Sequence, residues 1–277
     1  MKICKNIRSL KIDLNKIQKN KCLSLIPTMG YLHLGHLSLI KKAKKRKEFT
    51  VVSIFINPKQ FGPEEDLDKY PVNIKHDIEK LTKLKVDLLF IPKKKEIFDY
   101  KISSYRYKPL KIENILCGIN RPNYFPGVAD IIIRLFSIIN PDKSYFGEKD
   151  FQQYFFVKTL LKKLGFKSKV ISSKTIREKS GLAMSSRNQY LSIKEIKIAN
   201  KLYKFLKLNK KEINDKKNIS KSLAKYKNEL LNAGFTKIDY LEVRTDDLRK
   251  ANINSNNKRL FAAVFINETR LIDNIRV

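Results

Sequence analysis

The sequence has little cysteine, little histidine and no long apolar segment. Its 277 residues include three cysteines and three histidines. Cys4, Cys22 and Cys117 are widely spaced and form no CxxC pair, which argues against a disulfide framework and a cysteine zinc site. No apolar run approaches the roughly 20 residues of a membrane helix, and the amino terminus lacks the apolar segment of a signal peptide. We therefore predict a soluble, cytoplasmic protein with no membrane partner.

Acidic residues are scarce relative to basic ones. Lys and Arg number 59 against 27 Asp and Glu, which leaves a formal net charge of +32. Such an excess can indicate a nucleic-acid partner, but lysine is dispersed here over the whole chain. Abundant lysine, asparagine and isoleucine are together typical of an AT-rich genome. We attribute the charge to codon bias and predict no nucleic-acid partner, although the positive field would favour acidic substrates.

The length of 277 residues is enough for one large domain or, as we expect, two of ordinary size, and a hydrophobic content of 42% is enough for a core. In the first part, strand-like and helical segments alternate. This alternation predicts parallel βαβ units and a doubly wound sheet. Ligands on such sheets bind beyond the carboxyl ends of the strands, where the strand order reverses. Strands are expected at residues 23–26, 50–56, 86–91 and 169–172, and helices at 36–47, 73–85, 127–140 and 151–164.

The pattern changes after about residue 175. Two basic helices are expected at residues 193–208 and 219–233, followed by strands at 238–244, 259–267 and near the carboxyl terminus. The Lys/Asn-rich stretch 207–217 is expected to be a solvated linker or a helix surface. We therefore predict two domains: a larger α/β domain over residues 1–175 and a smaller α+β domain over residues 176–277.

Two of the three histidines, His33 and His36, flank Gly35 directly after the first apolar run. If Leu34 or Gly35 opens the helix, both imidazoles lie at its N-terminus, where free N–H groups and the helix dipole favour phosphate. Gly35 lacks a side chain that would keep a flat base or a ribose away from the backbone. Two alternatives stay open. The histidines could be structural, or they could share a metal ion, although no third ligand has the expected spacing.

Other polar segments are compatible with the same chemistry. In the turn GEKD, residues 147–150, Lys149 could reach a phosphate and Asp150 could bind a ribose hydroxyl or cap a helix. In MSSRN, residues 184–188, two hydroxyls and an arginine suit a loop that closes over phosphate. A surface turn and a helix-capping loop are the respective alternatives. Gln60 and Gln153 could orient a polar substrate, but neither amide is informative by itself.

Taken together, these segments resemble the pantothenate synthetase family, in its order and spacing, over nearly the whole chain. HxGH alone is shared with class I aminoacyl-tRNA synthetases and other nucleotidyl transferases, whereas the combination of longer motifs is specific. The resemblance implies a Rossmann-like sheet of the HxGH nucleotidyl transferase type with a smaller domain as a lid. The matching segments are PTMGYLHLGHLSL, VVSIFINPKQFGPEEDLDKYP, RPNYFPGVADIIIRLF, INPDKSYFGEKDFQQ, TIREKSGLAMSSRNQYLS, DYLEV and TRLIDNI.

The resemblance implies a ligase of pantothenate and coenzyme A biosynthesis. It would condense (R)-pantoate with β-alanine at the expense of ATP, through a pantoyl adenylate, and release AMP and pyrophosphate. The absence of an evident Ser-His or Cys-His arrangement fits this chemistry, because the first step needs charge stabilisation more than a covalent nucleophile. The resemblance also implies Mg²⁺ on the ATP phosphates without dedicated protein ligands, and a homodimer.

Residue roles follow from the same resemblance. The catalytic set would be His36 as proton donor, with His33, Lys149 and Arg187. Pantoate would contact Gln60, Gln153, Asn57, Tyr70 and Arg121, and Gln60 would also border β-alanine. The ATP site would comprise Met29, Gly30, Tyr31, Leu32, His33, Leu34, Gly35, His36, Gly147, Glu148, Lys149, Asp150, Ile176, Met184, Ser185, Ser186 and Arg187.

The chain departs from the family pattern at four positions. Leu34 stands where HEGH has glutamate, Tyr124 where RPxHF has histidine, and Pro126 and Asp130 also differ. The phenol of Tyr124 keeps a hydrogen-bond donor but cannot carry positive charge, so we expect a working enzyme with weakened turnover. An aminoacyl-tRNA synthetase fragment would need a KMSKS-type loop and an anticodon module, which are not evident. The intact HxGH, GEKD and MSSRN motifs argue against an inactive relic.

Overall fold

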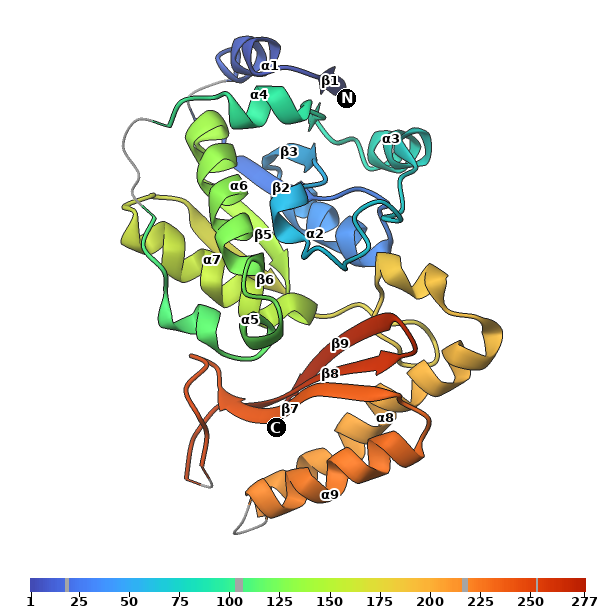
Figure 1. Cartoon of the computed structure of the whole chain (residues 1–277). Helices are drawn as coiled ribbons and strands as arrows, with labels where there is room; N and C mark the ends of the chain where they lie inside the picture. The colour runs from blue at the N-terminus through green and yellow to red at the C-terminus, as the bar shows by residue number, and fades with distance from the viewer. Residues whose placement is uncertain (18–19, 103–106, 216–218, 253) are drawn as a thin grey trace.

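Two sheets of different construction organise the chain. A computed structural model describes residues 1–17, 20–102, 107–215, 219–252 and 254–277. A six-stranded parallel sheet with helices on both faces lies above a three-stranded antiparallel sheet, and helices α8 and α9 lie beneath the smaller sheet (Figure 1). The predicted fold class is therefore confirmed. Among the described residues, no helix is both long and apolar enough to cross a membrane.

All neighbouring strands of the large sheet are parallel. The chain runs from β2 through β3 to β4 toward one edge, and from β5 to β6 toward the other. The strand order therefore reverses between β2 and β5, which is where ligands bind on doubly wound sheets. In sheet order the strands are β1 (Lys2–Cys4), β4 (Leu88–Phe90), β3 (Phe49–Ile54), β2 (Leu23–Thr28), β5 (Lys143–Gly147) and β6 (Lys169–Ser173).

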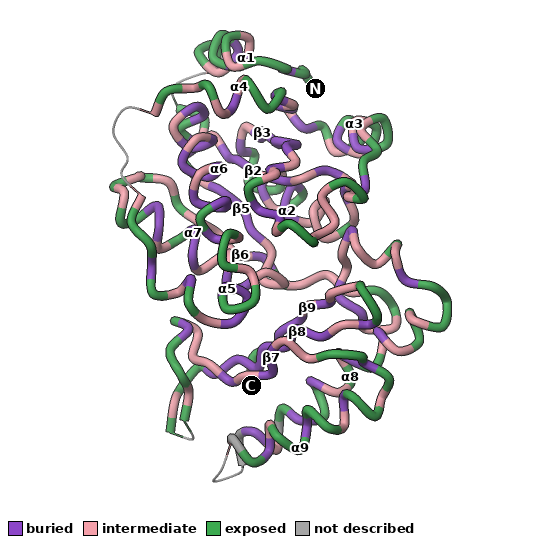
Figure 2. Tube along the Cα trace, viewed as in Figure 1, coloured by how far each residue is buried: buried purple, intermediate pink, exposed green. Residues whose placement is uncertain are grey.

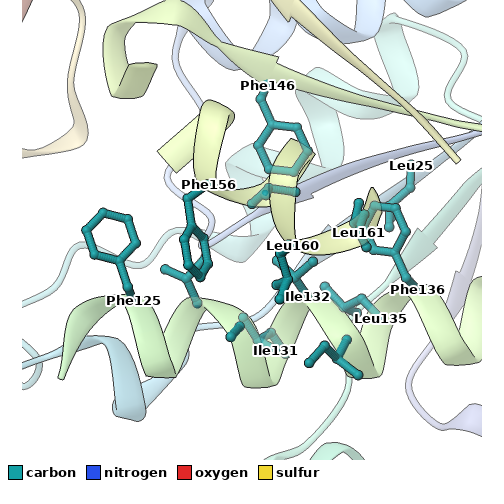
Figure 3. Close-up of a cluster of buried hydrophobic side chains, with 14 of the residues drawn as sticks. Leu25, Phe125, Ile131, Ile132, Leu135, Phe136, Phe146, Phe156, Leu160 and Leu161 are labelled. Carbon is teal, nitrogen blue, oxygen red and sulfur yellow. The ribbon is translucent and has the colours of Figure 1, made fainter. Parts of the chain in front are cut away.

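Alternate strand residues serve two cores, because successive side chains point to opposite faces of a sheet. Ile26 and Val52 pack with α2 (Leu34–Lys45) and α3 (Ile74–Lys83). Leu25 and Val51 pack on the other face with α6 (Tyr124–Ile139) and α7 (Phe151–Lys163). Figure 3 shows this second core, where side chains of α6 face those of α7 beneath the sheet. Strands β2 and β3 are therefore buried on both faces, as their continuous apolar sequence predicts.

Several short elements were not predicted. Most span three to five residues and the longest spans eight, which is less than the window of about 11–18 residues in which periodicity becomes informative. Edge strand β1 is one of them, although it pairs in parallel with β4. The others are α1 (Ile7–Leu14), α4 (Lys94–Phe98), α5 (Cys117–Asn120) and the 3₁₀ turns η1 (Pro58–Gln60), η2 (Lys111–Asn114), η3 (Glu148–Asp150) and η4 (Ser186–Tyr190).

The carboxyl-terminal part contains α8 (Ile193–Asp215), α9 (Ile219–Asn232) and the antiparallel strands β7 (Lys237–Thr245), β8 (Lys258–Ile266) and β9 (Thr269–Arg276). Helix α8 is longer than predicted, so the stretch expected as linker or helix surface is helical up to residue 215; residues 216–218 lie outside the described part. One face of the small sheet packs on both helices. Its other face carries Tyr240, Phe261 and Ala263 into the core beneath the large sheet, so buried residues continue across the junction (Figure 2). The domain boundary at residue 175 stays a prediction.

Candidate active site

A cavity lies between the carboxyl ends of the parallel strands and the small sheet. Its volume is about 1620 Å³, and residues from both parts of the chain line it. Pockets for single small molecules usually measure about 300–1,000 Å³, so this cavity has room for more than one ligand. It opens beside the ends of β2 and β5, where the strand order reverses. The segments after β2, after β3 and before α7 meet around it.

The turn after β2 is held in an unusual backbone conformation by a buried carboxylate. Gly30 and Tyr31 have positive φ angles of 87° and 50°, which glycine adopts freely and tyrosine does not. Asp77 on α3 is 1% exposed. It accepts hydrogen bonds from the backbone N–H of Tyr31 at 2.8 Å and of Leu32 at 2.7 Å. Asp77 thus directs the chain into α2, a role that was not predicted from the sequence.

The two histidines cap helix α2 reciprocally. The N–H of Gly35 donates to Nδ1 of His33 at 3.1 Å, and the N–H of His33 donates to Nδ1 of His36 at 3.3 Å. A neutral imidazole carries its proton on the nitrogen that does not accept. Both rings therefore bear hydrogen on Nε2, and no hydrogen bond from this nitrogen to another described residue is seen. A Cβ atom at residue 35 would lie 2.7 Å from Cε1 of His33, so the folded-back ring also requires glycine there.

Both imidazoles are neutral at physiological pH. Burial, together with His36 and the charge of Lys149, lowers the pKa of His33 to about 2. Burial also lowers the pKa of His36 to about 4, although Asp150 opposes the shift. The ring centroids are 4.1 Å apart, which makes two positive charges unfavourable there. The pair therefore offers N–H donors beside a helix N-terminus, and among the described residues no cluster of three metal-type ligands includes it.

The GEKD turn lies at the end of β5, next to β2 in the sheet. The ammonium of Lys149 is 3.7 Å from the carboxylate of Asp150, and both residues line the cavity. The carboxylate of Glu148 points elsewhere and accepts a hydrogen bond from the hydroxyl of Ser172 at 3.0 Å. Lys149 thus adds a positive charge to the same wall as the histidine pair.

The MSSRN loop closes the cavity from the carboxyl-terminal side. The hydroxyl of Ser186 donates to the carbonyl oxygen of Tyr31 at 3.3 Å, which joins this loop to the first turn. The guanidinium of Arg187 binds Asp66 through Nε at 2.9 Å and Nη2 at 2.7 Å. Ser185 caps the turn through the N–H of Arg187. An acidic loop therefore holds the arginine of the cavity wall.

A second arginine is held by the same acidic loop. Nε of Arg121 donates to Glu65 at 2.6 Å, and its guanidinium carbon lies 4.0 Å from the ring centroid of Tyr124. Nη2 of Arg121 also donates to the carbonyl oxygen of Gln60 at 3.1 Å. Burial raises the pKa of Tyr124, so its phenol is neutral. Gln60, Arg121 and Tyr124 line the cavity together with Gln153.

Most of the predicted site residues line this one cavity. The structure brings together residues from the turn after β2, the loop after β3, the GEKD turn with α7, and the MSSRN segment. The lining predicted residues are Met29, His33, Gly35, His36, Gln60, Tyr70, Arg121, Gly147, Lys149, Asp150, Gln153, Ile176, Met184, Ser185, Ser186 and Arg187.

Six predicted residues do not line it: Gly30, Tyr31, Leu32, Leu34, Asn57 and Glu148. The first three form the turn held by Asp77, and the Leu34 side chain is on the surface, 54% exposed. Asn57 is fully buried. Its amide donates to the carbonyl oxygen of Gly127 at 2.9 Å and accepts from the N–H of Lys59 at 3.2 Å. Asn57 therefore supports the loop that carries Gln60, and its side chain is not directed at the cavity.

Sequence reasoning missed further lining residues, including Glu65, Asp66, Arg270 and Asn274. All four lie in the quoted segments VVSIFINPKQFGPEEDLDKYP and TRLIDNI. A motif shows that residues belong together but not which side chain each will contact, so their partners could not be assigned.

The fold and the cavity define an HxGH-type nucleotide-binding enzyme, with paired histidines at a helix N-terminus beside the point where the strand order reverses. The chain matches the pantoate-beta-alanine ligase family over residues 2–276 and belongs to that family. It is 42% identical to the pantothenate synthetase of Caldicellulosiruptor saccharolyticus, with 100% of this chain and 99% of that protein covered. It is 45% identical to the pantothenate synthetase of Ruthia magnifica subsp. Calyptogena magnifica, with 99% and 98% covered.

Solved structures of the same family have the same fold. Pantothenate synthetase from Thermus thermophilus superimposes with a TM-score of 0.88 at 35% identity, covering 99% of each chain. The pantoate-beta-alanine ligase from Francisella tularensis, complexed with beta-gamma ATP and β-alanine, gives a TM-score of 0.84 at 37% identity, covering 100% of this chain and 97% of that one.

Proposed function

We propose that the cavity catalyses the ATP-dependent condensation of (R)-pantoate with β-alanine to pantothenate, AMP and pyrophosphate. The observation that carries this proposal is the convergence of two neutral histidine donors, Lys149 and the Arg187 loop on one cavity that also exposes two amides. Family membership supports it, as does the ligand-bound relative, which holds a nucleotide and β-alanine.

In the first half-reaction, a carboxylate oxygen of pantoate attacks the α-phosphorus of ATP. A C(O)O–P bond forms, the bond to the β-phosphate breaks, and pyrophosphate leaves. Nε2–H of His33 and of His36 would donate to phosphate oxygens, while Lys149 and Arg187 would neutralise the developing charge. Because His36 is neutral, we assign it hydrogen-bond donation to the leaving group rather than the transfer of a stored proton.

In the second half-reaction, the neutral amine of β-alanine attacks the acyl carbon of pantoyl adenylate. The amide C–N bond forms, the acyl C–O bond to AMP breaks, and the amine loses a proton. Gln60 and Gln153 would orient pantoate, with Tyr70 and Arg121 alongside, and Gln60 would border the incoming amine. The cavity lies between two parts of the chain, so closure would keep water away from the anhydride.

Binding of phosphates would require Arg187 to exchange its carboxylate partner. The carboxylate of Asp66 accepts two hydrogen bonds from the guanidinium of Arg187. A phosphate can bind an arginine in the same bidentate geometry. The acidic loop thus marks where an anionic ligand would bind. ATP would bring Mg²⁺ with it, because this ion keeps water ligands and binds phosphates with one or two carboxylates, and Asp150 lines the cavity.

The remaining assignments rest on the family resemblance. We propose a cytoplasmic homodimer in which residues 1–175 hold ATP and pantoate and residues 176–277 act as a lid. We also propose that its partners are these small molecules alone, with neither a nucleic acid nor a membrane among them.

Two assays test the proposed function. AMP should accumulate only when ATP, magnesium, pantoate and β-alanine are all present. Exchange of pyrophosphate into ATP should require pantoate but neither β-alanine, another amino acid nor tRNA. Lys149→Met should reduce both reactions strongly, whereas Lys158→Met, which changes an exposed lysine on α7, should reduce neither. Exchange driven by an amino acid instead of pantoate would refute the assignment.

A further inference from the structure

Strand β9 reaches across to the turn that carries Lys149. The side-chain amide of Asn274 donates hydrogen bonds to the carbonyl oxygens of Glu148 and Lys149, each at 2.9 Å. Asn274 is 4% exposed and belongs to the segment TRLIDNI, which has no role in the mechanism above. Asn274, which lies near the carboxyl terminus, therefore binds the backbone of the turn that carries Lys149.

The contact of the amide oxygen with Arg259 determines the orientation of the Asn274 side chain. Oδ1 of Asn274 accepts a hydrogen bond from Nη1 of Arg259 at 2.6 Å. Arginine only donates, so it must face the amide oxygen and leave the NH₂ group for the two carbonyls. Arg259 is 6% exposed, and its guanidinium carbon lies 4.0 Å from the ring centroid of Phe151. A buried amide with both ends satisfied is rigid, because any rotation leaves polar groups unpaired.

The neighbouring residue extends the same link to the other side of the cavity. Asp273 accepts two hydrogen bonds from Arg177, at 2.6 and 2.9 Å, and one from the N–H of Asn274 at 2.7 Å. Arg177 lies in the segment between β6 and the MSSRN loop. Two adjacent side chains of β9 thus connect the turn bearing Lys149 with the segment that leads to Arg187.

Elsewhere in the turn, the carboxylate of Glu148 accepts a hydrogen bond from Ser172 and lies 3.6 Å from a guanidinium nitrogen of Arg259. The first residue of the turn, Gly147, provides no side-chain cap, and the ammonium of Lys149 lies 3.7 Å from Asp150, its neighbour in sequence. The charge of Lys149 lowers the pKa of both His33 and His36, so the lysine acts on the same space as the imidazoles. The position of the Lys149 backbone therefore determines where its ammonium group lies relative to the two imidazoles.

We propose that Asn274 is a positioning residue that sets the place of Lys149 on the nucleotide phosphates and so couples β9 to adenylate formation. This proposal rests on the proposed function. Asn274 acts through the backbone of Lys149 and touches no reacting atom. Its contribution should therefore appear in the half-reaction that breaks the bond between phosphates and should be absent from the attack of β-alanine on a finished adenylate.

The test compares the two half-reactions in Asn274→Asp, which replaces the NH₂ group and its two N–H donors by one carboxylate oxygen facing the same carbonyls, at almost unchanged size. We expect pantoate-dependent exchange of pyrophosphate into ATP to fall on the order of 100-fold, the effect of a displacement of about 1 Å. Conversion of added pantoyl adenylate and β-alanine to pantothenate should stay close to wild type. In the Lys149→Met background, Asn274→Asp should cause no further loss of exchange.

Asn209→Asp is the matched control, because that buried amide on α8 donates to the carbonyl of Phe205 at 3.0 Å, away from the cavity. It should lower Tm without changing exchange per folded molecule. Equal loss in both half-reactions, additive loss with Lys149→Met, or an unchanged exchange rate would overturn the proposal. If Asn274→Asp does not fold, Asn274→Ala carries the same test. Absence of pantoate-dependent exchange in the wild type would instead refute the proposed function.

Discussion

At residue 33, a histidine takes the place that serine, threonine or aspartate occupies at most helix starts. Its Nδ1 can accept the N–H of Gly35 only while it carries no proton. Burial, which lowers the pKa to about 2, keeps it in that state. Helix capping and presentation of an Nε2–H donor thus depend on the same protonation state. One residue can therefore begin a helix and serve a phosphate site.

The pair should consequently show no titration between pH 5 and 8. Imidazole NMR of the ligand-free protein should find both rings as Nε2–H tautomers with constant shifts over that range. Because both pKa values are lowered, the unfolded state takes up protons first as pH falls below about 6.5, and the free energy of unfolding should fall with it. Titration of either ring with a midpoint near its ordinary pKa would contradict this assignment.

Tyr124 offers a second prediction at the residue scale. It lines the cavity at the position where the RPxHF pattern of the family resemblance implies histidine, and its raised pKa leaves it a neutral phenol under Arg121. Tyr124→His should increase turnover several-fold, because an imidazole can exchange protons near neutral pH. The measurement is kcat for pantothenate formation at saturating substrates. Tyr124→Phe serves as the control for simple loss of the hydroxyl, and unchanged kcat in Tyr124→His would argue against any handicap at this position.

At the scale of elements, helix α2 begins without the charge that its position favours. Leu34 is its first residue and is 54% exposed, and the first turn contains no acid. Positive partial charge gathers at a helix N-terminus, and exposed leucine gains little there. The glutamate of the HEGH pattern would fit both conditions.

Leu34→Glu should therefore raise the free energy of unfolding by about 0.3–1 kcal/mol at low salt. Urea denaturation of wild type, Leu34→Glu and the uncharged control Leu34→Gln would measure the gain. The difference between Glu and Gln should shrink in high salt, since screening weakens the interaction. Equal stability of the two variants at low salt would show that charge at this position has no effect.

At the scale of the whole molecule, the net charge of +32 is the dominant feature. Like charges repel one another most in the compact state, while the ion pairs near the cavity, such as Arg177 with Asp273, are partly buried and screened less. The folded state therefore carries an electrostatic cost that depends on ionic strength.

Tm should rise between 10 and about 150 mM sodium chloride, the range over which the Debye length falls from about 30 to 8 Å. Scanning calorimetry at fixed pH would measure it. A Tm that falls steadily with salt would mean that attractive pairs outweigh the repulsion. At these low sodium chloride concentrations, the effect of the salt on hydrophobic burial is small, so the change in Tm reports mainly on charge screening.

Much of the fold could be predicted from local patterns, and most of the residues predicted for the site line one cavity. The alternation of buried strands and amphipathic helices can be recognised from residues that are consecutive in the sequence. The same holds for the glycine and the histidines of the first turn. Short elements such as β1 were missed because three residues carry no periodicity. Asn57 was assigned to pantoate from its motif, yet in the structure its amide binds the backbone of Lys59 and Gly127.

The parallel sheet, the family and the set of polar segments around the cavity can be predicted from the chain, because each depends on residues near one another along it. The side chains that hold those segments became evident only in the folded structure: Asp77 beneath the first turn, Asp66 on Arg187, and Asn274 on the turn of Lys149. Such partners come from distant parts of the chain. They are selected by the packing of sheets and helices, which no local pattern encodes.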